Sequence, residues 1–350
     1  MESATRSVRN CLAQLNNESS IDEMTPRLGI VLAAGHGKRI RSETSKMLHE
    51  IWGEATVLRV AKAINKGLDS PNQIIVVGIK GEEVAAATGK RMGRRFAYQE
   101  NLVLCQPAGT GDAVRVALSE FDASARERDV YIFLGDMGLL TGEVVSQFRH
   151  SFEQANCDMM VLTGLYSGQS KDNYYGRIIR VPAADKKGVS SGPDEDRVIE
   201  IKEHKDILRI PEDAPYTVQF NGRSYDFSRK ELLETREINT GVFAFKEADL
   251  RRYIGEVNTN NAQGEVMLTD LLQIFNHHGK IVHAAVAARE EEILAFNVKS
   301  VLSQMQRIAR QWAYDQLKDT ITIADDEDFF IAEEVIQHIL EMDHDDAPVD

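Results

Sequence analysis

The chain has 350 residues, 43% of them apolar, and its 55 acidic side chains outnumber its 41 basic ones, which gives a net charge of −14. This length allows one large α/β domain, or two smaller ones, with ample core. The charge argues against nucleic acid as a partner, because no run of Lys and Arg offsets the repulsion between an acidic chain and its phosphates.

Cysteine usage and hydropathy restrict the compartment. Cys11, Cys105 and Cys157 are widely spaced and form no CxxC pair, so neither a disulfide framework nor a zinc site is expected. The N-terminal stretch lacks the apolar core of a signal peptide, and no window approaches the length of a membrane span. We therefore expect a cytoplasmic chain with no membrane partner.

The first part of the chain alternates strand and helix patterns after a polar N-terminal extension, residues 1–27, which we place outside the site. Strands are expected at 28–32, 73–78, 96–99, 130–134 and 159–166, and helices at 55–68, 111–121 and 141–155. Strand, crossover helix and strand in sequence predict parallel pairing. The predicted fold class is α/β, a doubly wound and mostly parallel Rossmann-like sheet, which binds ligands beyond the carboxyl ends of its strands.

The second part changes to strands and turns and is expected to form a β-rich lobe on the substrate side. Strands at 177–182 and 198–201 are followed by a hairpin at 216–228, indicated by Asn221-Gly222 between alternating apolar residues. A helix at 264–279, a strand at 281–287 and a helix at 299–312 complete the pattern. With no clean linker inside 28–312, one continuous domain is expected, followed by a tail at 313–350.

The loop after the first strand, LAAGHGKRIRSETSK, predicts a phosphate site. Gly35 and Gly37 allow a sharp turn whose exposed N–H groups form a nest for anions. Lys38, Arg39, Arg41 and Lys46 add positive charge. The loop is neither a Walker loop nor a dinucleotide fingerprint, because neither glycine pattern is complete. A Gly-rich turn on a solvated face is the alternative.

Two other strand ends carry polar groups suited to a nucleotide site. Asp136 directly follows an apolar strand in FLGD, where a carboxylate could hold Mg²⁺ together with substrate phosphates, or merely cap the next turn. In QPAGTGDA, Gln106 or the main chain could bind the edge of a base, while Gly109 and Thr110 let the base approach the backbone. Its alternative is a plain turn between strand and helix.

The motifs LAAGHGKR…SK, AGTGDA, FLGD, YYGRIIR, IKEHKD, EINTG, NNAQGEVMLTD and AFN, in this order, resemble the pyrophosphorylase domain of the N-acetylglucosamine-1-phosphate uridylyltransferases, which are sugar-1-phosphate nucleotidyltransferases. The resemblance runs from about Leu28 to Arg310. It implies that UTP and N-acetylglucosamine 1-phosphate are converted into UDP-N-acetylglucosamine and pyrophosphate, by Mg²⁺-assisted in-line attack on the α-phosphate.

The resemblance also implies roles for individual residues. The expected nucleotide-binding residues are Leu32, Ala33, Ala34, Gly35, Gly37, Gln106, Gly109 and Thr110; the catalytic residues are Arg39 and Lys46; the Mg²⁺ ligands are Asp136 and Asn297; and the residues that bind the amino sugar are Gly176, Glu203 and Asn239. Simpler alternatives remain for two of them, since Gly176 could serve only a turn and Glu203 only a salt bridge with a nearby lysine.

The chain also departs from the family pattern. Lys38, Ser45 and Asp112 stand where the family usually has Thr, Pro and His, and the uracil-binding Gln normally lies further ahead of GTG than Gln106 does. Residues from about 207 to 235 have no counterpart in the family. The acceptor therefore stays open between N-acetylglucosamine 1-phosphate and another hexose 1-phosphate such as glucose 1-phosphate, and a non-catalytic nucleotide-sugar-binding subunit is a further alternative.

The tail is the last departure. Bifunctional bacterial members continue into a left-handed β-helix that acetylates glucosamine 1-phosphate, and Thr320 to Ile336 resembles the first coil of such a helix. A single coil cannot bury its own face. We therefore expect no acetyltransferase activity, and the resemblance leaves open whether the chain forms a homo-oligomer.

Overall fold

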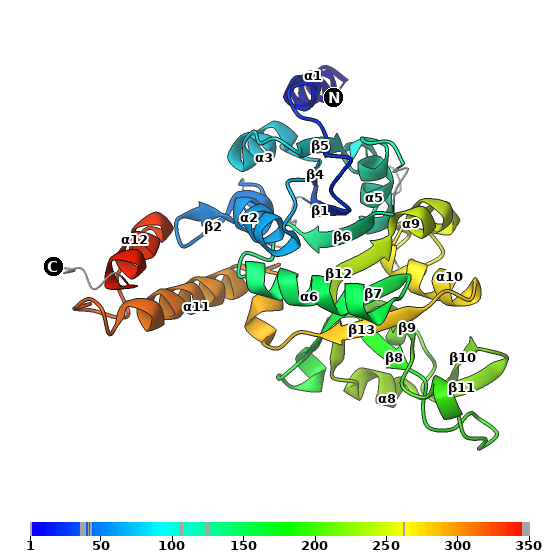
Figure 1. The fold of residues 1–350 in the computed structure, drawn as a ribbon. Helices are drawn as coiled ribbons and strands as arrows, with labels where there is room; N and C mark the ends of the chain where they lie inside the picture. Colours follow the sequence, from blue (N-terminus) through cyan, green and yellow to red (C-terminus); the bar gives the residue numbers. More distant parts are fainter. Residues whose placement is uncertain are drawn as a thin grey trace.

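The computed structural model describes residues 2–35, 40, 42, 44–104, 108–123, 127–261 and 263–344. A mixed sheet of nine strands forms its centre, with helices on both faces (Figure 1). Seven strands follow the order β13-β7-β12-β6-β1-β4-β5. Their bounds are β1 Arg27–Ala33, β4 Gln73–Val77, β5 Arg94–Tyr98, β6 Asp129–Leu134, β7 Met159–Leu165, β12 Glu237–Lys246 and β13 Val282–Val286, and β8 Arg177–Arg180 and β9 Val198–Lys202 extend the sheet from β12.

The bounds of the helices are α1 Glu2–Asn17, α2 Thr56–Leu68, α3 Gly81–Thr88, α4 Glu100–Val103, α5 Thr110–Leu118, α6 Gly142–Ala155, α7 His204–Ile207, α8 Arg229–Glu234, α9 Glu247–Tyr253, α10 Leu271–His277, α11 Lys299–Leu317 and α12 Glu333–His344. Helix α1 precedes the first strand, α11 and α12 follow the last one, and the other helices lie in the connections between strands. None of these described helices has the length and apolarity needed to cross a bilayer. The described strands and helices confirm the expected α/β class.

Of the seven strands in the order given above, all except β12 run in the same direction. β1 pairs in parallel with β4 and with β6, and β13 with β7. β12 runs antiparallel between β6 and β7, a position that the sequence pattern did not predict. Alternate residues of β1 enter the two cores: Leu28 and Ile30 pack with α5, α9 and α10, whereas Val31 and Ala33 pack with α2 and α6. Burial on both faces explains the continuous apolar pattern of β1.

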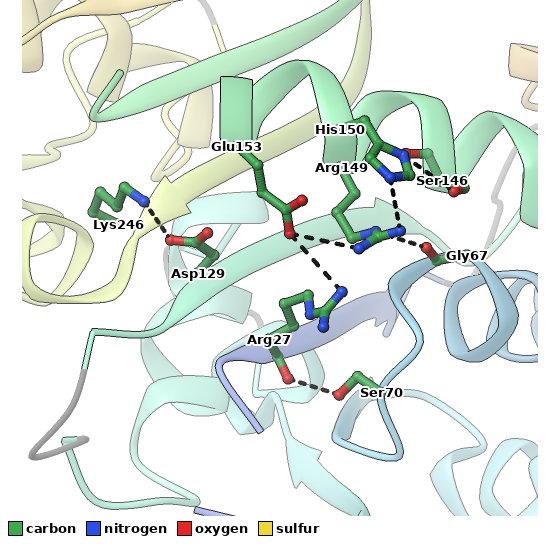
Figure 2. Close-up of polar contacts among 9 residues, drawn as sticks. All are labelled: Arg27, Gly67, Ser70, Asp129, Ser146, Arg149, His150, Glu153 and Lys246. Atoms are coloured by element: carbon green, nitrogen blue, oxygen red, sulfur yellow. Dashed lines mark hydrogen bonds and ion pairs between the residues drawn. The ribbon is translucent and has the colours of Figure 1, made fainter. Parts of the chain in front are cut away.

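Paired charges close the amino ends of the strands (Figure 2). Glu153 of α6 lies 3.9 Å from Arg27 at the start of β1 and 3.6 Å from Arg149. Lys246 Nζ donates to Asp129 Oδ1 at 2.8 Å, which ties the end of β12 to the start of β6. This end of the sheet is thus occupied by structural contacts, and the carboxyl ends are left for a site.

The expected hairpin at 216–228 is confirmed and has its own small core. β10 (Tyr216–Phe220) pairs with β11 (Arg223–Phe227) through a turn in which Asn221 and Gly222 both have positive φ. Val218, Phe220 and Tyr225 pack with residues of β8, β9, α7 and α8. The segment without a family counterpart therefore folds as part of the β-rich lobe.

The C-terminal region differs from expectation. Helix α11 continues through Trp312 to Leu317, so the boundary drawn at 312 falls inside a helix. The segment that resembles a β-helix coil contains no strand in the described residues, and its last residues open helix α12. The reason is that Ile336, Ile339 and Leu340 recur at helical spacing and pack against the end of α11 and the short hairpin β2 (Glu50–Ile51)–β3 (Glu54–Ala55).

Candidate active site

Three of the residues proposed for catalysis and metal binding meet beyond the carboxyl end of β6. Lys46 Nζ donates to Asn297 Oδ1 at 2.7 Å, across 251 positions of sequence, and forms an ion pair with Asp136 Oδ2. Lys46 begins a short 3₁₀ turn after the phosphate loop, Asp136 follows β6, and Asn297 precedes α11. Lys46 and Asp136 are buried and Asn297 is exposed, so the group lies at the edge of the core and is open on one side.

Gly135 explains how Asp136 reaches this position. Its N–H donates to the carbonyl of Leu32 at 3.0 Å, which joins the end of β6 to the end of β1. A Cβ at Gly135 would lie 3.0 Å from Met47 Sδ and 3.1 Å from Ala33 Cβ. A side chain here would therefore be crowded by Met47 and Ala33, and glycine lets the two strand ends and the turn that carries Lys46 lie close together.

The donor set fits Mg²⁺. Asp136 Oδ1 is buried and has no hydrogen-bond partner among the described residues, so it is available to a further ligand. Carboxylate and amide oxygens are the ligands that Mg²⁺ prefers, usually one or two from protein with the rest from water and phosphates. The described residues contain no group of three or more His, Cys, Asp or Glu that could hold a metal. A cation here would therefore have to share its coordination with the substrate.

The phosphate loop is described only in part. Leu32 and Ala33 are the last two residues of β1, Ala34 is buried, and no atom of the described residues lies within 4 Å of the position that a Cβ at Gly35 would take. Gly37 and Arg39 lie outside the described residues, as does Gln106. Their expected roles in phosphate and base binding stay predictions.

The second Gly-rich turn packs against the NAQGEVMLTD motif. Gly109 has a φ of 139°, and a Cβ there would lie 2.5 Å from the carbonyl oxygen of Val266. Gly111 N–H donates to that same oxygen at 2.8 Å, and Leu268 N–H donates to Thr110 Oγ1 at 2.9 Å. The glycines are needed because two backbones meet here, and the two motifs together shape one wall beside the strand ends.

Gln99 lies on the nucleotide side of the site but was not among the expected nucleotide-binding residues. It directly follows β5, is buried, and its Nε2 donates to the carbonyl of Gly109 at 2.8 Å and to Asp112 Oδ2 at 2.9 Å. Asp112 also accepts from Asn101 at 2.9 Å. Gln99 closes the strand expected at 96–99, and this place at a strand end, further ahead of GTG than Gln106, was the signal that could have identified it.

The three expected sugar-binding residues also meet, on the side of the β-rich lobe. Asn239 N–H donates to the carbonyl of Gly176 at 2.9 Å, and a Cβ at Gly176 would lie 3.0 Å from Glu203 Oε1. Asn239 lies where a bulge interrupts the pairing of β12 with β7, and its Oδ1 accepts from Gly241 N–H at 2.9 Å. The bulge lies near the start of β12, beside the point where Ile238 pairs with Arg177 of β8.

Glu203 has no ion-pair partner among the described residues, so the structure does not support its alternative as half of a lysine salt bridge. Burial, together with the neighbouring carboxylates of Asp206 and Asp270, raises the pKa of Glu203 to about 6, while the charge of Arg177 acts in the opposite direction. A half-buried carboxylate with no ion-pair partner among the described residues keeps its oxygens available to hydroxyl and amide donors of a ligand.

Arg177, the last residue of the YYGR motif, was not among the residues expected on the sugar side of the site. It is fully buried, and its guanidinium donates to the carbonyls of Asn173, at 2.7 Å, and Tyr175. These contacts hold the loop that ends at Gly176. An arginine directly after a glycine expected to bind sugar was the available signal.

The chain is similar in sequence to known proteins. Residues 29–171 match the family model of the MobA-like NTP transferase domain. The bifunctional protein GlmU of Streptomyces griseus is 33% identical over 290 residues, which cover 82% of this chain and 51% of that protein. GlmU of Clostridium tetani is 31% identical over 311 residues, 88% of this chain and 58% of that protein. Together these matches support a sugar-1-phosphate nucleotidyltransferase similar to GlmU.

Solved structures agree with this nucleotidyltransferase assignment at the level of the fold. A nucleoside-diphosphate-sugar pyrophosphorylase from Vibrio cholerae superimposes with a TM-score of 0.51 at 14% identity, covering 79% of this chain and 99% of that one. A CMP:2-keto-3-deoxy-manno-octonic acid synthetase superimposes with a TM-score of 0.52 at 12% identity, covering 82% and 99%. The nucleotidyltransferase chain spans about half the length of the GlmU proteins that it matches.

Proposed function

We propose that the protein joins UTP and N-acetylglucosamine 1-phosphate to give UDP-N-acetylglucosamine and pyrophosphate. The observation that carries the proposal is the meeting of Lys46, Asp136 and Asn297, a cation and two oxygen ligands from distant parts of the chain, beside the end of the phosphate loop. The relatives named GlmU and the second group, Gly176, Glu203 and Asn239, support the same assignment.

In the proposed reaction, a phosphate oxygen of the sugar phosphate attacks the α-phosphorus of UTP. The bond from the α-phosphorus to the oxygen that bridges to the β-phosphate breaks, and pyrophosphate leaves with its electron pair. A phosphate monoester has a second pKa of about 6, so it is mostly a dianion at neutral pH and needs no general base. The barrier lies in bringing two polyanions into line and stabilising the charge that develops on the leaving group.

The side chains divide this electrostatic task. Lys46 and Arg39 would neutralise the phosphates, and the main chain from Leu32 to Gly35 would hold the nucleotide. Asp136 and Asn297 would hold Mg²⁺, which when bound supplies a Lewis acid for the phosphate oxygens. Glu203 would accept hydrogen bonds from the amino sugar, and the side-chain amide of Asn239 would donate one to it. Gly176, which has no side chain, would leave room for the sugar.

A second candidate acceptor is another hexose 1-phosphate. The observation that favours it is the β10–β11 hairpin with α8, which adds to the acceptor-side lobe residues without a counterpart in the family pattern. In this case the nucleotide half of the site is unchanged, and only the contacts to the sugar ring differ.

Pyrophosphate release measured across five nucleoside triphosphates and several sugar 1-phosphates, with and without Mg²⁺, tests the proposal. The expected result is fastest release from UTP with N-acetylglucosamine 1-phosphate, and none without a divalent cation. Preference for glucose 1-phosphate or another hexose phosphate would support the second candidate. Tight nucleotide-sugar binding without any release would instead indicate a non-catalytic subunit.

A further inference from the structure

We propose that Lys46 competes with a divalent cation for Asp136 and Asn297, and that cation binding frees its ammonium group for the nucleotide phosphates. The inference rests on one part of the proposed function, namely that these two residues hold a divalent cation. It assigns Lys46 two successive positions, one as the internal counter-charge of the site and one as the phosphate contact.

The geometry makes the two occupants mutually exclusive. Lys46 Nζ contacts both oxygens, Asp136 Oδ2 and Asn297 Oδ1, the latter at 2.7 Å. Mg²⁺ holds its oxygen ligands at about 2.0–2.1 Å, so a cation bound by the same oxygens would lie in the space that the ammonium group fills. Two positive charges at this separation repel strongly in a partly buried site. A cation bound through Asp136 Oδ2 and Asn297 Oδ1 therefore displaces the ammonium group, and the exclusion concerns these two oxygens and not Asp136 Oδ1, which has no hydrogen-bond partner among the described residues.

The burial of the Asp136 carboxylate explains why Lys46 pairs with it while no divalent cation is bound. Asp136 is 5% exposed and Lys46 is 7% exposed, so the carboxylate would be an unpaired buried charge without its partner. The amide of Asn297 completes the contact, and Nζ lies 5.6 Å from the centroid of the Phe296 ring. The ammonium group thus satisfies a site whose donor set suits a metal.

The lysine side chain can make the transfer without moving the backbone. Its four-carbon stem rotates freely enough to carry the ammonium group away from Asp136 while Cα stays in the 3₁₀ turn at Lys46–Leu48. That turn comes shortly after the phosphate loop in the sequence, so the proposal moves the released ammonium group toward the phosphates. Cation binding would then prepare the charge that the reaction needs.

The test measures Mn²⁺ binding and thermal stability of the nucleotide-free protein, so it does not depend on turnover. In Lys46→Met the competing charge is gone, and Mn²⁺ affinity, measured from the EPR signal of free Mn²⁺, should rise on the order of tenfold or more over wild type. The Tm of Lys46→Met should be below wild type without divalent cation and should recover when Mn²⁺ is added. When Asp136→Asn is added to Lys46→Met, both the higher Mn²⁺ affinity and the recovery of Tm by Mn²⁺ should be lost.

Lys246→Met is the matched control. Lys246 also forms an ion pair with an aspartate, Asp129, at the opposite end of β6 (Figure 2), so its loss should lower Tm without any recovery by Mn²⁺. If Lys46→Met does not fold without divalent cation, Lys46→Gln is the neutral variant to use, with the same expected gain in affinity.

Equal or weaker Mn²⁺ binding in the neutral variants than in wild type would overturn the inference. Tight Mn²⁺ binding that survives Asp136→Asn would also overturn it, because the cation would then be bound elsewhere. If the competition is observed but UTP is not turned over, the proposed reaction fails and the inference stands. If UTP is turned over but Lys46 does not affect Mn²⁺ affinity, the inference fails and the proposed reaction stands.

Discussion

The side chain of Asn16 binds the backbone of Phe96 on both sides of the residue: Nδ2 donates to the carbonyl and Oδ1 accepts from the N–H, each at 2.8 Å. Phe96 lies in β5, the edge strand of the central sheet. Helix α1 therefore supplies, through one amide, the contacts that a neighbouring strand would make. The N-terminal extension is a structural part of the domain, since it covers an edge that could otherwise pair with another chain.

Asn16→Ala should lower the free energy of unfolding by about 1–3 kcal/mol, because it leaves a buried N–H and carbonyl without partners. It should also promote aggregation through the uncovered edge. Urea unfolding and light scattering check the two effects. The control is Ser7→Ala on the same helix, whose hydroxyl makes an exposed bond to Glu82 and should change stability little. Wild-type stability in Asn16→Ala would mean that α1 does not protect β5.

Lys46→Ala should lower kcat for pyrophosphate release by about 10²-fold or more, the usual cost of losing one preorganised electrostatic contact. We expect the same of Arg39→Ala, although Arg39 lies outside the described residues. Steady-state kinetics at saturating UTP measure the effect, with circular dichroism to verify the fold. Unchanged kinetics in both variants would place the reaction elsewhere.

Asp136→Asn should abolish turnover that depends on a divalent cation while the fold is retained, because the replacement keeps the shape of the side chain and removes its charge. A titration of rate against Mg²⁺ concentration checks this. If the variant kept near-normal rates, Asp136 would be a structural cap and not a metal ligand.

Stability should fall as pH rises from about 4 to 7, owing to Glu203 and Asp270. Burial, with the negative charges around them, raises the pKa of each carboxyl to about 6. The folded state therefore binds protons more tightly than the unfolded chain, so the stabilisation is complete below the unfolded pKa and is lost as pH rises through the folded one. Glu203→Gln should flatten this fall by on the order of 2 kcal/mol. Urea unfolding at several pH values tests it, and an unchanged slope in the variant would contradict it.

Trp52→Ala should release the C-terminal segment. Trp52 Nε1 donates to the carbonyl of Ile331 at 2.8 Å, and its ring lies against Phe329 and Phe330, with centroids at 5.5 and 5.1 Å. Because the indole is only half-buried, the loss should be about 2 kcal/mol, below the value for a core tryptophan. Limited proteolysis should then cut between α11 and α12.

Phe330→Ala is the control for that prediction. Phe330 is 59% exposed, so its removal should affect proteolysis much less than the loss of Trp52. Equal resistance of wild type and Trp52→Ala would show that the segment is held by α11 alone.

Local patterns predicted most of the elements. The apolar runs of β1, β4, β6 and β7 and the periodic faces of α2 and α6 depend only on neighbours in sequence, and so does the Asn221-Gly222 turn. The helix expected from 264 begins only at Leu271. Val266 explains the difference, since its N–H donates to Ala108 and its carbonyl accepts from Gly111, which keeps this stretch extended. Contacts between residues so far apart in the sequence do not change the local hydrophobic pattern from which the helix was predicted.

The candidate site shows the same division. Local settings identified Lys46, in the basic loop after the first strand, and Asp136, at a strand end, whereas Asn297 was expected only from the family resemblance. Their meeting, the place of β12 between β6 and β7, and the use of Gln99 and Asp112 in one network depend on chain segments far apart. The amino-acid sequence by itself determined the chemical groups and the strand ends that carry them. Only the tertiary structure decided which of these groups lie within bonding distance, because that depends on how the sheet orders its strands and not on any local pattern.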